Sequence, residues 1–173
     1  SNGATCGGDL VGTWNVTASC LSLSGDMDIS LSSLGCATVP ATGSLSVTGS
    51  WTANANKKYA DQTKTTGWVT FPLAKKCLTI SSVPVSCTDA ATIFKSLGWA
   101  TSECTEEASG DCSCKNTAEQ TGGIGIVNAW ADKSGDYTVS GSDLSVDERV
   151  DYSYCVSGDK LTLTPKQTIL PLT

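Results

Sequence analysis

Nine cysteines in a chain of 173 residues without a single histidine constrain the fold more than any other feature. Three of them fall in the stretch CTEEASGDCSC, residues 104–114. A structural zinc site needs two close pairs of ligands, and the only close pair here is Cys112 and Cys114. A thioredoxin-type redox site needs a CxxC motif, which the sequence lacks. We therefore expect no metal and no cofactor, and predict a disulfide framework in an oxidising compartment: extracellular, periplasmic or at a cell surface.

The spacing of the cysteines suggests how they are joined. Two of the predicted disulfides each bracket one irregular excursion of the chain, and a third ties the N-terminal arm to the last strands. We expect the two CxC cysteines to point to opposite faces of a strand, so that they do not both form disulfides on the same side. The predicted pairs are Cys87–Cys104, Cys20–Cys36, Cys6–Cys155, and Cys77 with either Cys112 or Cys114. Because nine is odd, one cysteine is left as a thiol or pairs outside this sequence.

Composition and periodicity favour β-structure. Ser and Thr are abundant and strong helix formers are sparse, which is typical of strands and turns. Short segments alternate between apolar and polar residues, as in SLSVTGSWTA (44–53) and GWVTFPLA (67–74). No apolar run approaches the ~18 residues of a membrane-spanning helix. No signal-peptide pattern opens the chain, so we expect a mature or trimmed form.

One segment breaks the alternation and predicts a helix. Within CTDAATIFKSLGW (87–99), Asp89 is suited to the N-cap, and Ile93, Phe94 and Leu97 have helical spacing. Gly98 is a typical stop signal. We expect a helix of about ten residues within a cysteine-rich insertion at about 86–115.

A duplicated sequence motif predicts the structure of the C-terminal part of the chain. YTVSGSDLSV (137–146) and YCVSGDKLTL (154–163) align without gaps, each with a turn on Gly141 or Gly158 between two strands. Two such hairpins in succession form an up-and-down meander. With the other short strands, they predict an all-β fold, an antiparallel up-and-down barrel with a short disulfide-bracketed helical insertion.

Two of these features together carry a resemblance. The first strand opens with GTW, Gly12 to Trp14, and the last hairpin reads YCVSGDKLTLT. The chain thereby resembles lipocalin-like domains of the calycin superfamily, and its insertion resembles that of secreted, cysteine-rich bacterial members. The resemblance implies one barrel domain over residues 1–173, built from eight strands, with Trp14 closing one end.

In that family an arginine packs over the tryptophan of this motif. Arg149 is the only arginine of the chain, so the resemblance implies a cation–π contact between Arg149 and Trp14. The alternative is a solvated Arg149 paired with Asp147, Glu148 or Asp151. Both arrangements are open at this point.

The charge and the missing histidine exclude several functions. The net charge is −6 and the cations are scattered, which argues against nucleic acid as a partner. Serine and cysteine nucleophiles usually need a histidine base, and the acidic pairs fall in loops without a complete catalytic or calcium-binding set. We therefore expect no catalytic residues and no enzyme.

Two interpretations of the aromatic residues remain. They either line a cavity for a small apolar or amphipathic ligand, or they fill a barrel that serves as a structural or protein-interaction module, with a protein partner or a cell-surface tether. The candidate ligand-binding residues are Trp14, Trp51, Trp68, Tyr137, Tyr152 and Tyr154.

Overall fold

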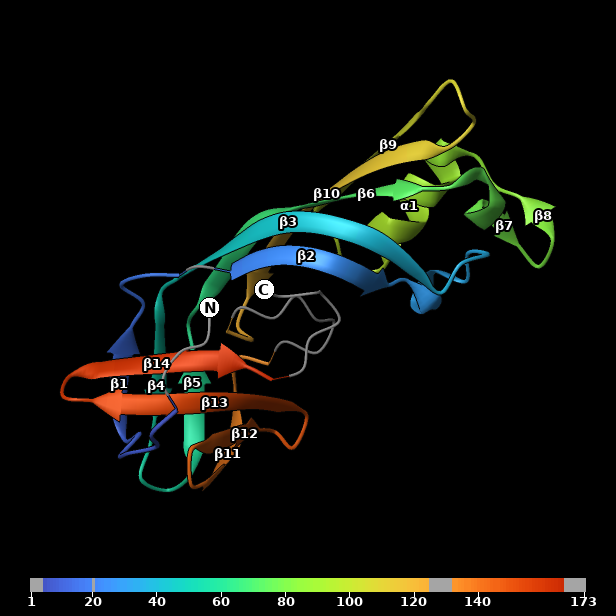
Figure 1. The fold of residues 1–173 in the computed structure, drawn as a ribbon. Helices are drawn as coiled ribbons and strands as arrows, with labels where there is room; N and C mark the ends of the chain where they lie inside the picture. The colour runs from blue at the N-terminus through green and yellow to red at the C-terminus, as the bar shows by residue number, and fades with distance from the viewer. Residues whose placement is uncertain (1–4, 20, 125–131, 167–173) are drawn as a thin grey trace.

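The strands are divided between two antiparallel sheets and a small hairpin. The computed structural model describes residues 5–19, 21–124 and 132–166 (Figure 1). The first sheet has seven strands in the order β1 (Gly12–Asn15), β4 (Ser50–Ala53), β5 (Lys58–Asp61), β11 (Ser134–Ser140), β12 (Asp143–Val146), β13 (Val150–Ser157) and β14 (Lys160–Pro165). The second has five in the order β2 (Leu21–Asp28), β3 (Thr38–Thr48), β6 (Lys64–Leu73), β10 (Cys112–Thr121) and β9 (Thr101–Glu106). The hairpin joins β7 (Thr79–Ile80) to β8 (Val83–Pro84).

The seven-stranded sheet curls into a nearly closed barrel, which confirms the predicted fold class. The duplicated hairpins form β11–β12 and β13–β14, and their turns begin at Gly141 and Gly158, whose φ angles are 61° and 62°. Glycine reaches this left-handed region without the steric cost that a side chain imposes. The eight strands implied by the resemblance are not found among the described residues, where the barrel sheet has seven.

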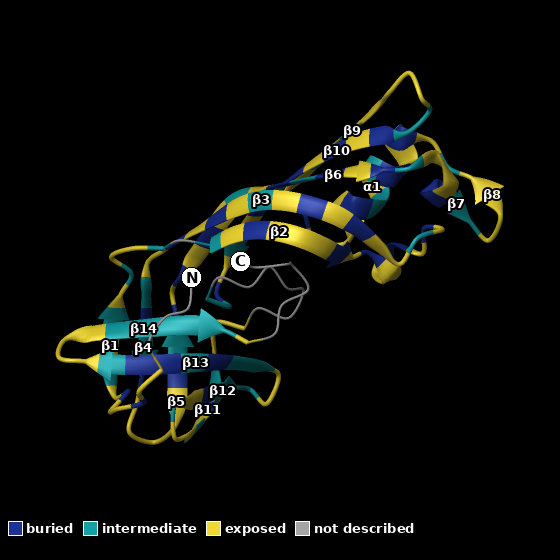
Figure 2. Cartoon of the chain, in the orientation of Figure 1, coloured by how far each residue is buried: buried dark blue, intermediate teal, exposed yellow. Residues whose placement is uncertain are grey.

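The five-stranded sheet curves away from the barrel and carries a core of its own. Along β2 and β3, buried and exposed residues alternate, as the banding in Figure 2 shows. The inner positions of β3 and β6 include Leu45, Val69 and Phe71, each at most 2% exposed. The alternation follows from the pleat, because successive side chains of a strand point to opposite faces.

The chain passes between the two sheets at a junction built on a glycine and a buried carboxylate. Gly49 separates β3 from β4 at a φ of 94°, and a Cβ there would come within 2.3 Å of the Gln62 carbonyl oxygen. The Asp61 carboxylate accepts hydrogen bonds from the backbone amide and hydroxyl of Thr63, at 2.8 and 2.6 Å, and from the Ile124 amide at 3.3 Å. Asp61 is only 3% exposed, so these donors replace the water that its oxygens lose on burial.

The predicted helix is present as α1 (Cys87–Ser96). Its N-cap is Ser86 instead of the expected Asp89: the Ser86 hydroxyl accepts from the Asp89 amide at 3.1 Å, and the Asp89 carboxylate accepts from the Ser86 amide at 3.2 Å. This reciprocal capping box satisfies two backbone donors that a helix start leaves unpaired. Phe94 is 2% exposed and meets Phe71 edge-to-face at 5.0 Å, so α1 is anchored on the five-stranded sheet. Short 3₁₀ turns lie at Ser30–Ser32 and Lys75–Cys77.

Four disulfides join the described cysteines, and one of the predicted pairs is confirmed. The pairs are Cys6–Cys155, Cys36–Cys77, Cys87–Cys112 and Cys104–Cys114. The Cys6–Cys155 bond was expected, and it holds the N-terminal arm against β13, where the Val156 amide donates to the Gly7 carbonyl at 2.8 Å. The remaining cysteine, Cys20, lies outside the described residues. The four disulfides indicate an oxidising compartment.

The other pairings predicted from spacing are wrong. Cys87–Cys104 does not form, because residues 101–106 are strand β9, whose register places Cys104 opposite Cys114. Cys112 and Cys114 point to the same face of β10, since alternate residues of a strand share a face. Both therefore form their disulfides on the face of β10 on which α1 lies.

The predicted Cys20–Cys36 pair and the Cys77 pairing with Cys112 or Cys114 are also replaced. Cys36 is bonded to Cys77, and beside this bond the Gly35 amide donates to the Cys77 carbonyl at 2.9 Å. The disulfide thus joins the loop after β2 to the turn after β6. It links two separate segments of the chain and does not close a single loop.

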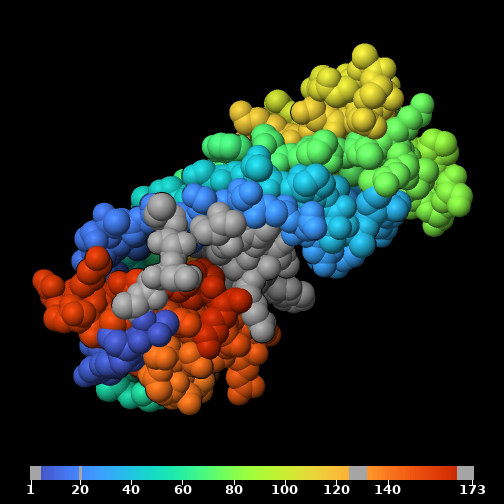
Figure 3. Space-filling view, in the orientation of Figure 1, coloured from blue at the N-terminus to red at the C-terminus, as the bar shows by residue number. Residues whose placement is uncertain are grey.

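The cysteine-rich stretch 104–114 forms a β-hairpin, because it connects β9 to β10. Its strands extend the five-stranded sheet, and α1 with the β7–β8 hairpin lies at the far end of that sheet (Figure 1). Figure 3 shows the resulting elongated molecule, with the barrel strands at one end. The expectation of one domain over residues 1–173 stays a prediction. No helix among the described residues has the length and apolar character needed to cross a membrane.

Candidate functional site

The interior of the barrel contains four of the six predicted ligand-binding residues. Trp51, Tyr137, Tyr152 and Tyr154 are each at most 2% exposed. Tyr59, which the sequence analysis did not select, completes this set at 4% exposure. Trp51 stacks on Tyr59 with ring centroids 6.0 Å apart and meets Tyr137 edge-to-face at 5.9 Å. These rings come from four strands and belong to one buried cluster.

The tyrosine hydroxyls are bonded within the protein. Tyr137 donates to the Asn54 carbonyl at 2.8 Å, and Tyr154 donates to the Gly8 carbonyl at 3.0 Å. Tyr152 donates to the Ile124 carbonyl at 3.1 Å. Burial raises the pKa of all three phenols, because the charged form would lose its hydration. The aromatic set is thus hydrogen-bonded at its polar ends as well as packed at its rings.

The other two predicted ligand-binding residues lie elsewhere. Trp14 is half-buried on β1, directly opposite Trp51 on β4, and its indole nitrogen donates to the Leu10 carbonyl at 2.9 Å. Trp68 belongs to β6 of the five-stranded sheet and is 42% exposed. The structure therefore gathers four of the six candidates with Trp14 beside them, and separates Trp68 from the group.

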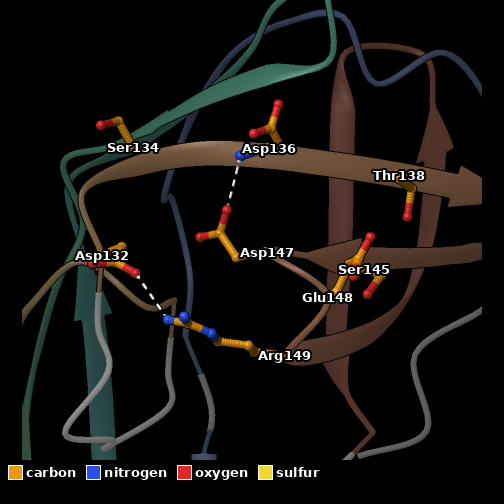
Figure 4. Close-up of a pocket in the computed structure, with 8 residues that line it drawn as sticks. All are labelled: Asp132, Ser134, Asp136, Thr138, Ser145, Asp147, Glu148 and Arg149. Carbon is orange, nitrogen blue, oxygen red and sulfur yellow. Dashed lines mark hydrogen bonds and ion pairs between the residues drawn. The ribbon is translucent and has the colours of Figure 1, made fainter.

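The predicted contact between Arg149 and Trp14 is absent from the described residues. The Arg149 guanidinium instead lies 3.5 Å from the Asp132 carboxylate, an ion pair in which both side chains are more than half exposed. Arg149 belongs to the β12–β13 turn, which directs it along the outside of the barrel (Figure 4). The cation–π contact that the described residues do form places Lys57 over the Tyr137 ring, 5.3 Å from its centroid.

An acidic groove of about 430 Å³ lies on the outside of the barrel (Figure 4). It is formed by β11 and the residues just before it, by one residue of β12, and by the β12–β13 turn. Its lining consists of Asp132, Ser134, Asp136, Thr138, Ser145, Asp147, Glu148 and Arg149. The sequence analysis did not select these residues, because the start of β11 and the β12–β13 turn are separate in the sequence and only the fold brings them together.

Asp147 links this groove to the barrel interior. One carboxylate oxygen accepts from the Asp136 amide at 2.8 Å, and the other accepts from the Tyr59 hydroxyl at 2.5 Å. Burial, followed by the bond to Asp147, raises the pKa of Tyr59. A Cβ on Gly135 would come within 2.1 Å of the Asp147 carboxylate, so a side chain at this position would displace that carboxylate.

The groove is acidic, but several of its carboxylates have partners. Asp132 pairs with Arg149, and Asp136 pairs with Lys58 at 2.6 Å. Glu148 is exposed at the rim. Within the described part of the chain, no three side chains of the metal-binding types converge on one point. The arrangement therefore suits hydrogen bonding and charge attraction at a surface.

The sequence and the structure were also compared with known proteins. No family model, no curated protein and no solved structure matches this chain. The structure itself places the chain in a fold class: a mostly β protein with a nearly closed antiparallel barrel and disulfides.

Proposed function

We propose that this protein is a lipocalin-like, disulfide-stabilised interaction module, secreted or held at a cell surface. The observation that carries the proposal is the barrel interior, which is occupied by the protein's own side chains. Trp51, Tyr59, Tyr137, Tyr152 and Tyr154 are each at most 4% exposed. An antiparallel barrel of this size is just wide enough for side chains to fill it.

A filled barrel makes an apolar ligand cavity costly to open. Displacing Tyr137 or Tyr154 would break the hydrogen bond that its hydroxyl donates to a backbone carbonyl. The proposal therefore places recognition on the outer surface. The proposal includes no catalytic step, and the chain has no histidine, the side chain that most often serves as a general base.

Uptake of an apolar probe tests this proposal. We expect the purified protein to carry no apolar ligand in native mass spectrometry and to leave the fluorescence of 1-anilinonaphthalene-8-sulfonate unchanged. Tyr137→Ala titrated with benzene is the positive control, because removing a buried ring leaves a cavity that a molecule of this size can enter. A co-purified lipid, or binding of the probe by the unmodified protein at one site, would favour the cavity-binding interpretation and refute a filled barrel.

A second candidate function is favoured by the acidic groove: binding of a small cationic ligand. Its volume falls within the range of about 300–1,000 Å³ that is common for ligand sites. Its lining is polar, with four acidic residues and one basic residue among eight, so it suits an amine better than an apolar molecule. The test is titration with spermidine at low and high salt. Glu148→Gln should weaken binding, whereas Glu107→Gln, on the β9–β10 turn, should not; equal effects would exclude the groove.

A further inference from the structure

Two polar side chains lie opposite each other inside the five-stranded sheet and have no hydrogen-bond partner among the described residues. Asn116 on β10 and Ser102 on β9 are directly opposite in the strand register, next to the opposed pair Cys114 and Cys104. Asn116 is 0% exposed. Its amide nitrogen and amide oxygen, and the hydroxyl oxygen of Ser102, are all buried and form no hydrogen bond with the described residues. Native proteins leave few such atoms unpaired.

The two side chains do not bond each other, although short polar side chains that are directly opposed in an antiparallel pair lie close together. The polar atoms of Asn116 and Ser102 are thus left for a third group. A water commonly bridges neighbouring polar groups that do not bond directly.

The hydrogen-bonding groups define the chemistry of the missing partner. Asn116 offers two N–H donors and an oxygen acceptor, and the Ser102 hydroxyl can donate and accept. A cation would satisfy only the oxygens, and an anion only the donors. Neither residue carries a charge to compensate an ion in this buried place. The partner must be neutral and able both to donate and to accept.

We infer that Asn116 and Ser102 bind a buried water molecule that bridges β10 to β9. Water is the smallest neutral molecule with both a donor and an acceptor, and buried waters typically make about three hydrogen bonds to polar groups that are otherwise unsatisfied. β9 is an edge strand with β10 as its only neighbour in the sheet. The bridge therefore fastens this edge beside the Cys104–Cys114 disulfide, on the face on which Cys114 and Asn116 are buried.

The direct test is nuclear magnetic resonance of the full chain with its disulfides intact. The side-chain amide protons of Asn116 should show a cross-peak to a slowly exchanging water. Asn116→Leu and Ser102→Ala should each raise the unfolding equilibrium constant by about tenfold, since each leaves a buried group without its partner. The double variant should be no less stable than either single variant, because both variants disrupt the same bridge.

The outer face of the same two strands supplies a matched control. Thr101 and Thr117 are also directly opposite, but they lie toward solvent and their hydroxyls bond directly at 2.6 Å. Thr101→Ala with Thr117→Val should leave the water signal at Asn116 unchanged. The inference is overturned if that signal is absent from the unmodified protein or if the two buried substitutions are additive. An organic molecule seen by native mass spectrometry and lost in Asn116→Leu would likewise refute water as the partner.

Discussion

At the scale of single residues, the β12–β13 turn shows how backbone strain and hydrogen bonding oppose each other. Asp147 and Glu148 have φ angles of 52° and 54°, in the left-handed region that disfavours side chains. Asp147 holds the Tyr59 hydroxyl and the Asp136 amide, whereas Glu148 is exposed at the groove rim. The same substitution at the two positions separates the two effects.

We predict that Asp147→Gly destabilises the protein and Glu148→Gly does not. Glycine relieves strain of roughly 1 kcal/mol at either site, and its flexibility in the unfolded chain offsets part of this gain. Only Asp147→Gly also leaves Tyr59 without its acceptor, a loss of about 1–3 kcal/mol. Urea denaturation of both variants gives the comparison. Equal free energies of unfolding would show that the Asp147 carboxylate, with its bonds to Tyr59 and the Asp136 amide, contributes nothing.

At the scale of elements, two disulfides hold α1 and β9 to β10. Their β10 cysteines are two residues apart on the same strand. Cys112 binds Cys87 of α1, and Cys114 binds Cys104 of β9. The helix and the edge strand are therefore each joined to β10, and not to each other. This connectivity has a direct chemical signature.

Peptide mapping without reduction should show that signature. Cleavage after leucine, lysine and glutamate separates Cys104 from the CxC pair at Glu106 and Glu107, and separates Cys87 from Cys77 at Leu78. We expect one complex in which the fragment with Cys112 and Cys114 holds both the Cys87 fragment and the Cys104 fragment. Recovery of the Cys87 fragment joined to the Cys104 fragment alone would contradict the register of β9 on β10. The Cys6–Cys155 link, which lies in the barrel, serves as the reference.

At the scale of the whole molecule, all four tyrosines lie in the barrel core, at 1–4% exposure. Burial raises the pKa of each phenol above its ordinary value near 10. A group whose pKa is raised by folding stabilises the folded state below the unfolded pKa. That contribution is then lost as the pH rises through and beyond this value. The barrel should therefore be stable at neutral pH and weaken in strong alkali.

Spectrophotometric titration at 295 nm should reveal this behaviour. We expect little tyrosinate absorbance at about pH 10 in the folded protein, followed by a cooperative rise as the barrel unfolds at higher pH. In concentrated guanidinium chloride the same four groups should titrate near pH 10, which is the control. A smooth titration centred near pH 10 without unfolding would show that the phenols are accessible and that the barrel is not filled.

The elements that depend on neighbouring residues could be predicted from the sequence. The hairpins at Gly141 and Gly158 and the helix near Ile93 and Phe94 follow from turn chemistry and periodicity over a few residues. The helix start was misplaced from Ser86 to Asp89, because both residue types can cap a helix and the geometry alone selects one.

The sequence by itself determined an all-β chain with a duplicated hairpin, one short helix and an oxidising environment, because these properties rest on local pattern and composition. Tertiary structure decided the rest. The same alternation serves the barrel and the five-stranded sheet, so it does not tell which strands share a core. The register of β9 on β10 chose Cys114 for Cys104. The fold also brought Ile124 to Asp61 and Asp147 to Tyr59, contacts between residues far apart in sequence that no local pattern encodes.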